Sequence, residues 1–598
     1  MRAISSSIKY FTNSPQMILS VLAVSIVFLS LRLLNRKSQL SRIPAVGNAT
    51  SKEARRKEFL SGKARDLYIE GYKKEDSIFL QFKDSAFRIM TARRKMSKPH
   101  RVVTNKLINS AESECVAVSP AFLKHLKKLP EDVLSFNEAV EEVKGKPLAS
   151  TSDANLISIK ALQTRYTNIT SNVPTIPHTL KTSLNPALCE SSRDRGNSNS
   201  FLIMSARLNP IILGEVKDAT QTEFPQSANW SEVRISSKLV RIVAKTSGRI
   251  FVGPDLCRDE VYLDAAVNYT LDMTAAIQAV GFISPWLRPF LALRAPQVKK
   301  LHHRFKQADD FLRPVVIARR QAAHNDLDEM NKPDDMLQWL MDSQDKFGQQ
   351  NDRAISKYQL SLTFAAIHTT TAVLTNAFYN LAAIPDLIST LREEVEEILA
   401  STRGMITATA VQRMVKLDSF LKEIMRFYPQ SAKAFVAAFQ RKVMKPVTLP
   451  NGQVIPAGVI VEVPSHAINY DETIYTNPET FDALRFYKIR TEKEAALRGK
   501  MSSEEAFTEA ATNNQFASVG DTSLAFGYGR NACPGRFFAA NEIKMILATT
   551  LLKYDLKMPD GCPERYKNLS FGSQSVPDPS KSIMMKLRKQ TRIDIPQN

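Results

Sequence analysis

Residues 526–554 read FGYGRNACPGRFFAANEIKMILATTLLKY, a glycine-bearing loop followed by a run with apolar residues at helical spacing. Cys533 lies where the loop meets the predicted helix. A helix N-terminus offers unpaired N–H groups and the positive end of the helix dipole, and both favour a thiolate and lower its pKa. The glycines of the loop lack a Cβ, so a flat ligand can approach the backbone closely. The stretch therefore predicts a cysteine ligand for a metal cofactor with one open face.

Other roles for this cysteine are weaker interpretations of the same stretch. A buried structural cysteine is the ordinary alternative, because free cysteine is among the most buried residue types. Zinc is disfavoured, since no other Cys or His stands at ligand spacing around Cys533. A phosphate-binding loop is disfavoured as well, because no Gly-Lys-Ser/Thr follows the glycines.

Length and composition agree with a large folded enzyme. The chain has 598 residues, of which 43% are hydrophobic and 24% are charged, and this balance excludes wholesale disorder. Five cysteines are too few for a disulfide scaffold in a chain of this size, and no two of them form a C-x-x-C pair. We therefore expect the body of the protein in a reducing compartment.

An uncharged apolar segment near the N-terminus predicts a membrane anchor. No charged side chain occurs over residues 10–31, and residues 17–31 are rich in Leu, Val and Ile. The segment is followed by Arg32, Asn35, Arg36 and Lys37 and not by the small-x-small pattern of a signal-peptide cleavage site. Basic residues follow the segment more densely than they precede it, which places the body in the cytosol. We predict a short lumenal N-terminus over 1–16 and a transmembrane anchor over 17–34.

The net charge of +21 is concentrated close to this anchor. Residues 32–63 contain nine Lys/Arg and two Asp/Glu, and residues 91–108 contain six Lys/Arg without an acid. Polybasic segments beside an anchor bind anionic lipid headgroups, so the charge needs no nucleic acid. No zinc finger or aromatic-basic RNA motif is present either. We interpret residues 35–60 as a basic, proline-containing hinge.

Most of the remaining chain shows the three- and four-residue apolar spacing of helices. Strand-like alternation is confined to short pieces, one of which contains Asn451-Gly452, a hairpin turn signal. The pattern predicts a mainly α fold with small β-sheets, with helices over 360–377, 391–400, 418–427 and 537–552 and strand-like segments over 251–253 and 447–463.

Two of these helices carry polar residues that stand out. Glu423 and Arg426 are three residues apart on one predicted helix face, where such a pair is usually solvated and contributes little. The helix over 360–377 contains three consecutive threonines, Thr369 to Thr371, which are poor helix formers. Their ordinary role is to bond back to carbonyls one turn earlier and bend the helix.

The pattern Phe526-x-x-Gly529-x-x-x-Cys533-x-Gly535 resembles the haem-binding loop of the cytochrome P-450 family. The resemblance implies a cytochrome P-450 fold with an N-terminal transmembrane helix, and haem b whose iron takes its axial thiolate from Cys533. Phe526, Gly529 and Gly535 would contact the haem. Asn531 stands where the family usually has His or Arg facing a haem propionate, and its amide can still donate a hydrogen bond.

The resemblance extends to the two polar helices. Glu423 and Arg426, with Arg485 of the stretch PETFDALRF, resemble the Glu-Arg-Arg triad that locks the core behind the haem. The helix over 360–377 resembles the distal helix, which makes Thr369 the residue expected to help deliver protons during oxygen activation. His368 replaces the acid that usually precedes this threonine, so the proton path would use water or imidazole.

The resemblance covers residues 43–587. Its motifs are most similar to those of the fungal, microsomal, ent-kaurene-oxidase-like group, for example in RIFVGPDLCRDEVYLDAAVNYT over 249–270. It implies a single-pass protein of the endoplasmic reticulum membrane with a cytosolic haem-binding domain over 61–598. Three segments, near 88–114, 144–162 and 189–206, read as insertions relative to the family pattern. They are either surface loops or untranslated gene segments included in the chain, and we favour the second interpretation.

The function implied is a monooxygenase that inserts one oxygen atom from O₂ into an apolar small molecule, a terpenoid or alkaloid intermediate of fungal secondary metabolism. Electrons would come from NADPH through a separate reductase, with cytochrome b5 as a further partner, while the basic segments contact membrane lipid. Two alternatives stay open. One is a haem-thiolate isomerase or dehydratase, which needs neither O₂ nor a reductase, and the other is a non-catalytic haem protein.

Overall fold

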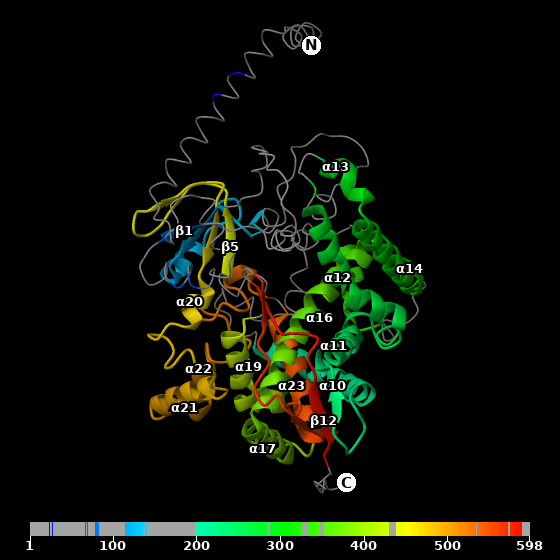
Figure 1. Ribbon diagram of the computed structural model, residues 1–598, viewed down its shortest axis with the longest axis vertical. Coiled ribbons are helices and arrows are strands. Elements are labelled where there is room, and N and C mark those ends of the chain that lie inside the picture. Colours follow the sequence, from blue (N-terminus) through cyan, green and yellow to red (C-terminus); the bar gives the residue numbers. More distant parts are fainter. Residues whose placement is uncertain are drawn as a thin grey trace.

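The computed structural model describes most of the chain from residue 198 onward and several shorter parts before it (Figure 1). The described residues are 23, 27, 66, 69, 78–82, 114–136, 138–139, 198–281, 283, 287–324, 332–346, 352–429, 438–533, 535–571 and 574–588. The predicted anchor over 17–34, the hinge over 35–60 and the insertions near 88–114 and 144–162 lie almost wholly outside them. Of the insertion near 189–206, the last nine residues belong to a helix.

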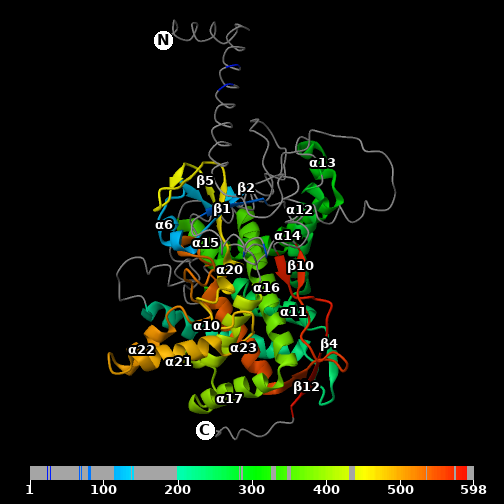
Figure 2. The same ribbon diagram turned by 60° about the vertical axis from the view of Figure 1, so that its left-hand side comes forward.

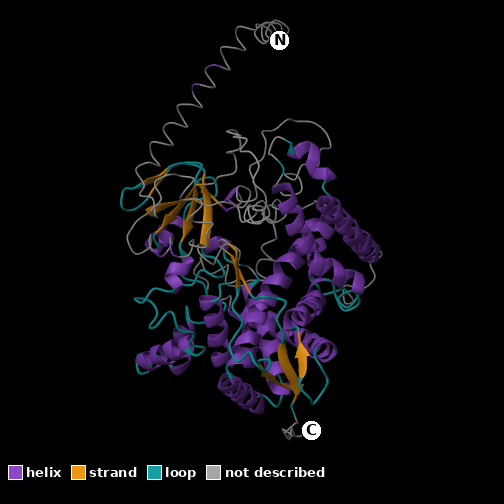
Figure 3. Cartoon of the chain, in the orientation of Figure 1, coloured by secondary structure: helices purple, strands orange, loops and turns teal. Residues whose placement is uncertain are grey.

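The fold is mainly helical, as predicted (Figure 3). Its helices of eight or more residues, within the described part, are α10 (Ser198–Glu223), α11 (Ile235–Phe251), α12 (Glu260–Gly281), α14 (Pro296–His324), α15 (Met336–Lys346), α16 (Asp352–Ala383), α17 (Pro385–Ser401), α19 (Val415–Phe427), α21 (Arg485–Leu497), α22 (Ser503–Ala511) and α23 (Arg536–Lys553). Shorter helices are α6 (Leu123–Leu126), α13 (Arg288–Leu291), α18 (Ala408–Arg413) and α20 (Ser465–Asn469), with 3-10 turns η3 (Pro120–Phe122), η5 (Ala292–Arg294) and η7 (Gly529–Asn531).

The strands form four small sheets. A five-stranded sheet has the order β1-β2-β8-β5-β3, in which β2 and β8 are parallel and the other pairs are antiparallel. A three-stranded sheet has the order β4-β12-β9, and β6-β7 and β10-β11 are two-stranded. The strands are β1 (Ile78–Phe82), β2 (Glu114–Val118), β3 (Leu134–Ser135), β4 (Ser231–Val233), β5 (Ala438–Val443), β6 (Val447–Thr448), β7 (Val454–Ile455), β8 (Ile460–Val463), β9 (Tyr554–Lys557), β10 (Leu569–Phe571), β11 (Gln574–Val576) and β12 (Ile583–Leu587).

Helix α16 runs through the middle of the molecule, and α11, α12, α14, α19 and α23 pack against it (Figures 1 and 2). Its side chains Leu374, Ala377 and Phe378 are fully buried in the larger core cluster, which also contains Ile546 and Leu547 of α23. A second cluster lies under the five-stranded sheet and includes Tyr528 of the loop before Cys533. The cysteine loop therefore meets both cores, which fixes its position against helices and sheet alike.

The helices predicted from apolar spacing are present as parts of α16, α17, α19 and α23. The hairpin predicted at Asn451-Gly452 joins β6 to β7, and Gly452 has the positive φ of 82° that such turns favour. The strand expected over 251–253 is wrong. Phe251 is the last residue of the amphipathic helix α11 and packs in its core, and Gly253 leaves the helix with a φ of 89°.

Among the residues that the structure describes, none of the helices combines the length and the apolar character needed to span a lipid bilayer.

Candidate active site

The loop before α23 holds Cys533 in a closed turn. The N–H of Cys533 donates to the carbonyl oxygen of Phe526 at 2.7 Å, which ties the two ends of the loop together. Gly527 and Gly529 have φ values of 79° and 67°, in the left-handed region that other residues rarely adopt. A Cβ on Gly527 would come within 3.2 Å of the backbone oxygen of Asn531. These two glycines are therefore required by the turn itself.

Gly535 has a different role from these two glycines. Its φ of −87° suits any residue, and a Cβ there would meet no atom of the described residues within 4 Å, its chain neighbours aside. Neither the backbone conformation nor a protein neighbour therefore calls for glycine at this position. The space beside Gly535, two residues after Cys533, fits a bulky group that approaches the backbone closely, as a haem face does.

The Cys533 thiol differs from the sequence expectation in its pKa. The side chain is half-buried, and this burial raises the pKa of the thiol above its usual value. The N–H groups of Gly535 and Arg536, together with the charge of Arg536, act in the opposite direction but do not outweigh burial. The helix N-terminus alone does not make a thiolate here, so a metal cation has to displace the proton when it binds.

Asn531 supplies a second feature that fits a bound group. It ends the 3-10 turn η7, and its amide Nδ2 is buried without a hydrogen-bond partner in the described part of the protein. A buried donor left unpaired is costly, and most such groups have a partner. The amide lines a small cavity together with the side chains of Lys127 and Arg441. A donor that shares a cavity with two cationic residues fits a carboxylate, such as a haem propionate.

Behind the loop, the structure brings Glu423, Arg426 and Arg485 together. Arg426 binds both carboxylate oxygens of Glu423, with Nε–Oε2 and Nη2–Oε1 distances of 2.8 Å each. Arg485 Nε lies 3.3 and 3.2 Å from Oε1 and Oε2. Glu423 is fully buried, and the N–H of Asp482 donates to it as well. Such a desolvated, bidentate cluster is a fixed structural element rather than a surface pair.

The two guanidinium groups also fasten the segment between α20 and α21. Arg426 Nη1 donates to the carbonyl oxygen of Pro478 at 2.9 Å, and Arg485 Nη2 donates to those of Asn477 and Thr480 at 3.1 and 2.8 Å. Helix α19 is thereby locked to a segment that has no regular structure of its own. This is the arrangement that the sequence resemblance implied for the three residues.

The distal helix α16 presents an open stripe near its middle. Ala365 and Thr369, one turn apart, are exposed, although Ile367 and Thr370 between and beside them are buried. Thr369 Oγ1 donates to the carbonyl oxygen of Ala365 at 2.7 Å, the back-bonding expected of a threonine inside a helix. A small residue and a hydroxyl therefore face open space on a stretch of helix where Ile367 and Thr370 are buried.

His368 lies beside this stripe and points to another helix. Its Nε2 is 2.9 Å from the carbonyl oxygen of Val267 in α12. A carbonyl only accepts, so Nε2 carries the proton and Nδ1 is left as an acceptor in the neutral ring. Burial lowers the pKa of His368, while the bond to Val267 raises it by less. The imidazole is therefore neutral at physiological pH.

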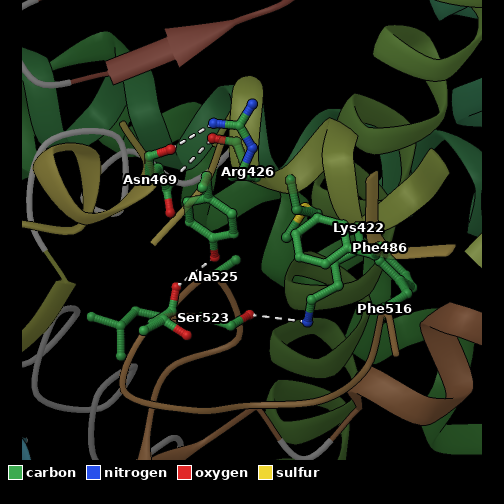
Figure 4. Close-up of a pocket in the computed structure, with 11 residues that line it drawn as sticks. Lys422, Arg426, Asn469, Phe486, Phe516, Ser523 and Ala525 are labelled. Carbon is green, nitrogen blue, oxygen red and sulfur yellow. Dashed lines mark hydrogen bonds between the residues drawn. The ribbon is translucent and has the colours of Figure 1, made fainter. Parts of the chain in front are cut away.

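One charged residue of this region was missed by sequence reasoning. Lys422 precedes Glu423 in α19, is only 4% exposed, and lines a small cavity with Arg426, Ser523 and Ala525 (Figure 4). Burial lowers the pKa of Lys422 to about 8. A signal existed in the sequence, because residues 418, 422 and 426 follow each other at four-residue spacing on the same helix face.

A mainly helical fold, a cysteine in a glycine-bearing loop before a long helix, an open space beside that cysteine and an unpaired amide near two cations together define a haem-thiolate protein. Comparison with known proteins gives the family. Residues 189–585 match the cytochrome P-450 family model. The chain therefore belongs to the cytochrome P-450 family, whose members bind haem through a thiolate.

Curated relatives agree with this assignment. The chain is 34% identical over 479 residues to the cytochrome P-450 monooxygenase ATR3 of Stachybotrys chlorohalonatus, covering 80% of this chain and 90% of that protein. It is 36% identical over 374 residues to the monooxygenase BOA4 of Botryotinia fuckeliana, covering 62% of this chain and 71% of that protein. A monooxygenase of Emericella nidulans is 33% identical over 455 residues, covering 76% and 78%. The protein is a haem-dependent monooxygenase.

Proposed function

We propose that this chain oxygenates an apolar terpenoid or alkaloid intermediate of fungal secondary metabolism, with haem b held by Cys533 and electrons from NADPH delivered by a separate reductase. The resemblance of several sequence motifs to the ent-kaurene-oxidase-like group supports a terpenoid or alkaloid as the substrate. The single observation that carries the proposal is Cys533, enclosed in its turn beside the open space at Gly535. When bound, haem supplies the chemistry that activates O₂.

The residues of the chain supply position and proton handling. Asn531 Nδ2, which is buried without a hydrogen-bond partner among the described residues, would donate a hydrogen bond to a propionate. Thr369 donates its hydroxyl proton to Ala365, which leaves the Oγ1 lone pairs to accept from a water molecule. His368 offers Nδ1 as a second acceptor next to it in the sequence. We assign these two residues, Thr369 and His368, to the passage of protons across the open stripe of α16.

Two surfaces support the proposed partners. Lys127 lies over the ring of Tyr528 in the cysteine loop, with its Nζ 5.0 Å from the ring centroid, and Lys124 and Lys128 are close to it in the sequence. The positive side chain of Lys127 at this loop suits an acidic electron donor, a reductase or cytochrome b5. Away from the loop, Leu271 of α12 and Phe290 of α13 are 59% and 66% exposed. Exposed apolar side chains and the segment over 17–34 support contact with the endoplasmic reticulum membrane.

The experiment that tests this function is turnover under ¹⁸O₂. The full chain would be expressed in microsomes with a reductase, supplied with NADPH and a panel of apolar terpenoids and indole alkaloids, and its products examined by mass spectrometry. A product with one ¹⁸O atom that requires NADPH is the expected result. A rearranged product formed without O₂ would favour the isomerase or dehydratase instead, and no product with any compound would favour a non-catalytic haem protein.

A matched variant tests the proton assignment in the same assay. Thr369→Ala is expected to lower the product formed per NADPH consumed and to raise hydrogen peroxide release, because the hydroxyl that holds water on α16 is gone. Thr371→Ala, on the same helix but with a buried side chain, is the control and is expected to keep the wild-type ratio.

A further inference from the structure

Lys422 has no part in the Glu423 triad, although it is the adjacent residue. Its ammonium group points away from Glu423 and donates three hydrogen bonds, to the carbonyl oxygen of Gln515 at 2.9 Å and to the hydroxyls of Ser518 and Ser523 at 3.0 and 3.3 Å. Figure 4 shows the bond to Ser523 across the cavity between α19 and the chain that leads to the cysteine loop. All three acceptors belong to one segment, residues 515–523.

Asp418 holds the same segment from one turn earlier in α19. Its Oδ2 accepts the N–H of Phe516 at 2.7 Å. Its Oδ1 forms an ion pair with Lys544 of α23, the helix that follows the cysteine. Residues four apart lie on one face of a helix, so Asp418 and Lys422 act on the segment together. The pair thus connects α19 with the chain on both sides of Cys533.

The segment reaches Cys533 in a few short steps. The ring of Phe516 stands edge-on to that of Phe526, with centroids 5.3 Å apart. Leu524 follows the last contact of Lys422 directly and accepts the N–H of Gly527 at 2.9 Å. Phe526 accepts the N–H of Cys533. A shift of the segment therefore moves the turn that carries the thiol.

Burying the charged ammonium of Lys422 costs desolvation free energy, which indicates that this charge has a structural role. Among the described residues no carboxylate forms an ion pair with its Nζ; the negative charge of Asp418 acts on it only from a greater distance, while the oxygens of that carboxylate bind Lys544 and the N–H of Phe516. A buried ammonium without a paired carboxylate is expensive, and an apolar side chain of similar length would fill the space at lower cost. What an apolar side chain lacks is the set of three donors.

We propose that Asp418 and Lys422 form a second clamp, separate from the Glu423 triad, that positions the 523–526 chain and through it the Cys533 thiolate on the haem. Both are positioning residues and touch neither haem nor substrate. The inference rests on the haem-thiolate assignment of Cys533. It adds that ligation of the iron by the Cys533 thiolate depends on Lys422, whose ammonium donates to residues 515–523.

The test compares Lys422→Met with Lys416→Met in the full-length protein in microsomes. Lys416 is a partly exposed residue of the same helix whose ammonium lies over the ring of Tyr487, at 5.9 Å, and which makes none of the hydrogen bonds of the clamp. Two quantities are measured: the fraction of the reduced carbon monoxide complex with the strongly red-shifted thiolate band, and the rate of haem transfer to apomyoglobin. We expect Lys422→Met to convert most of the complex to the unshifted band and to lose haem about tenfold faster, the effect of losing hydrogen bonds to a charged group.

Wild-type spectra and haem transfer in Lys422→Met would overturn the proposal, as would a lower melting temperature with the thiolate fraction unchanged. Should Lys422→Met fail to fold, Ser523→Ala decides, because it keeps the lysine and removes one acceptor. A smaller loss of the thiolate band is expected in Ser523→Ala, and an unchanged band overturns the clamp. Absence of the band in the wild-type protein would instead refute the haem-thiolate assignment, so the two failures are distinguishable.

Discussion

His368 Nε2 and the carbonyl oxygen of Val267 lie 2.9 Å apart, and this contact joins the distal helix α16 to α12 next to the open stripe at Thr369. The hydrogen bond fixes the imidazole tautomer as well as its direction. The same ring that we assign to proton passage therefore also holds one wall of the site in place.

A pH dependence of stability follows from this contact. The pKa of His368 is lowered from 6.5 by burial, so the folded state binds fewer protons than the unfolded state. The stability that the neutral ring contributes is present above about pH 6.5 and is lost as the pH falls through the lower pKa of the folded protein. We expect urea unfolding to show a larger loss of stability toward about pH 5 in the wild type than in His368→Gln.

The exposed residue His303 of α14 gives the control. His303→Gln should follow the wild-type pH profile. A His368→Gln profile identical to the wild type would show that the ring titrates alike in both states.

The Glu423 triad predicts a large and asymmetric mutational effect. Glu423→Gln leaves the guanidinium groups of Arg426 and Arg485 buried with no carboxylate between them, which costs about 3–5 kcal/mol. Denaturant unfolding should show this loss, and the yield of haem-loaded protein should fall with it. Glu494→Gln, which breaks the pair of a partly exposed carboxylate with the exposed Arg498, should cost less than about 1 kcal/mol. Similar losses in both variants would contradict the structural role of the triad.

Asn531 predicts a change in haem retention rather than in folding. Asn531→Leu removes the buried amide Nδ2 at close to constant volume, and we expect haem to leave for apomyoglobin about tenfold faster, as for one hydrogen bond to a charged acceptor. Asn531→His restores a donor and should slow the loss again. Equal rates in Asn531→Leu and the wild type would mean that the amide does not meet the haem.

A buried acid between α11 and α23 predicts a second pH effect of opposite sign. Glu542 is fully buried, its Oε1 accepts from Ser247 Oγ at 2.8 Å, and burial raises its pKa from 4.5 to about 8. The folded state therefore binds more protons than the unfolded state between these values, and stability falls as the pH rises through them. The side chain of Glu542→Gln cannot titrate, so this variant should lack that pH-dependent loss of stability, which amounts to a few kcal/mol over the whole range. If the melting temperatures of the wild type and Glu542→Gln changed with pH in parallel, the raised pKa of Glu542 would be refuted.

Local features of the site could be predicted from the sequence. The cysteine loop and α23 are contiguous, and the residues of α16, α17 and α19 repeat at the helical period, so the spacing of a few side chains sufficed. The pair Glu423 and Arg426 also lies within one turn. For Arg485, which is far along the chain, only the family resemblance gave a role.

Features that depend on tertiary packing could not be predicted in this way. The hydrogen-bond partners of Lys422 lie about a hundred positions later in the chain, and the sequence separation between the paired strands β2 and β8 is larger still. The pKa of Cys533 differs from expectation because enclosure by surrounding segments outweighs the helix N-terminus, and enclosure has no local sequence signal. The same holds for the unpaired amide of Asn531.

The most direct test of the account is the carbon monoxide difference spectrum of the reduced protein in microsomes, recorded beside Cys533→Ser. We predict a strongly red-shifted Soret band in the wild type that disappears in Cys533→Ser, because only a thiolate ligand produces that shift. Absence of the band in the wild type, or its persistence in Cys533→Ser, would contradict the central claim that Cys533 binds the haem iron.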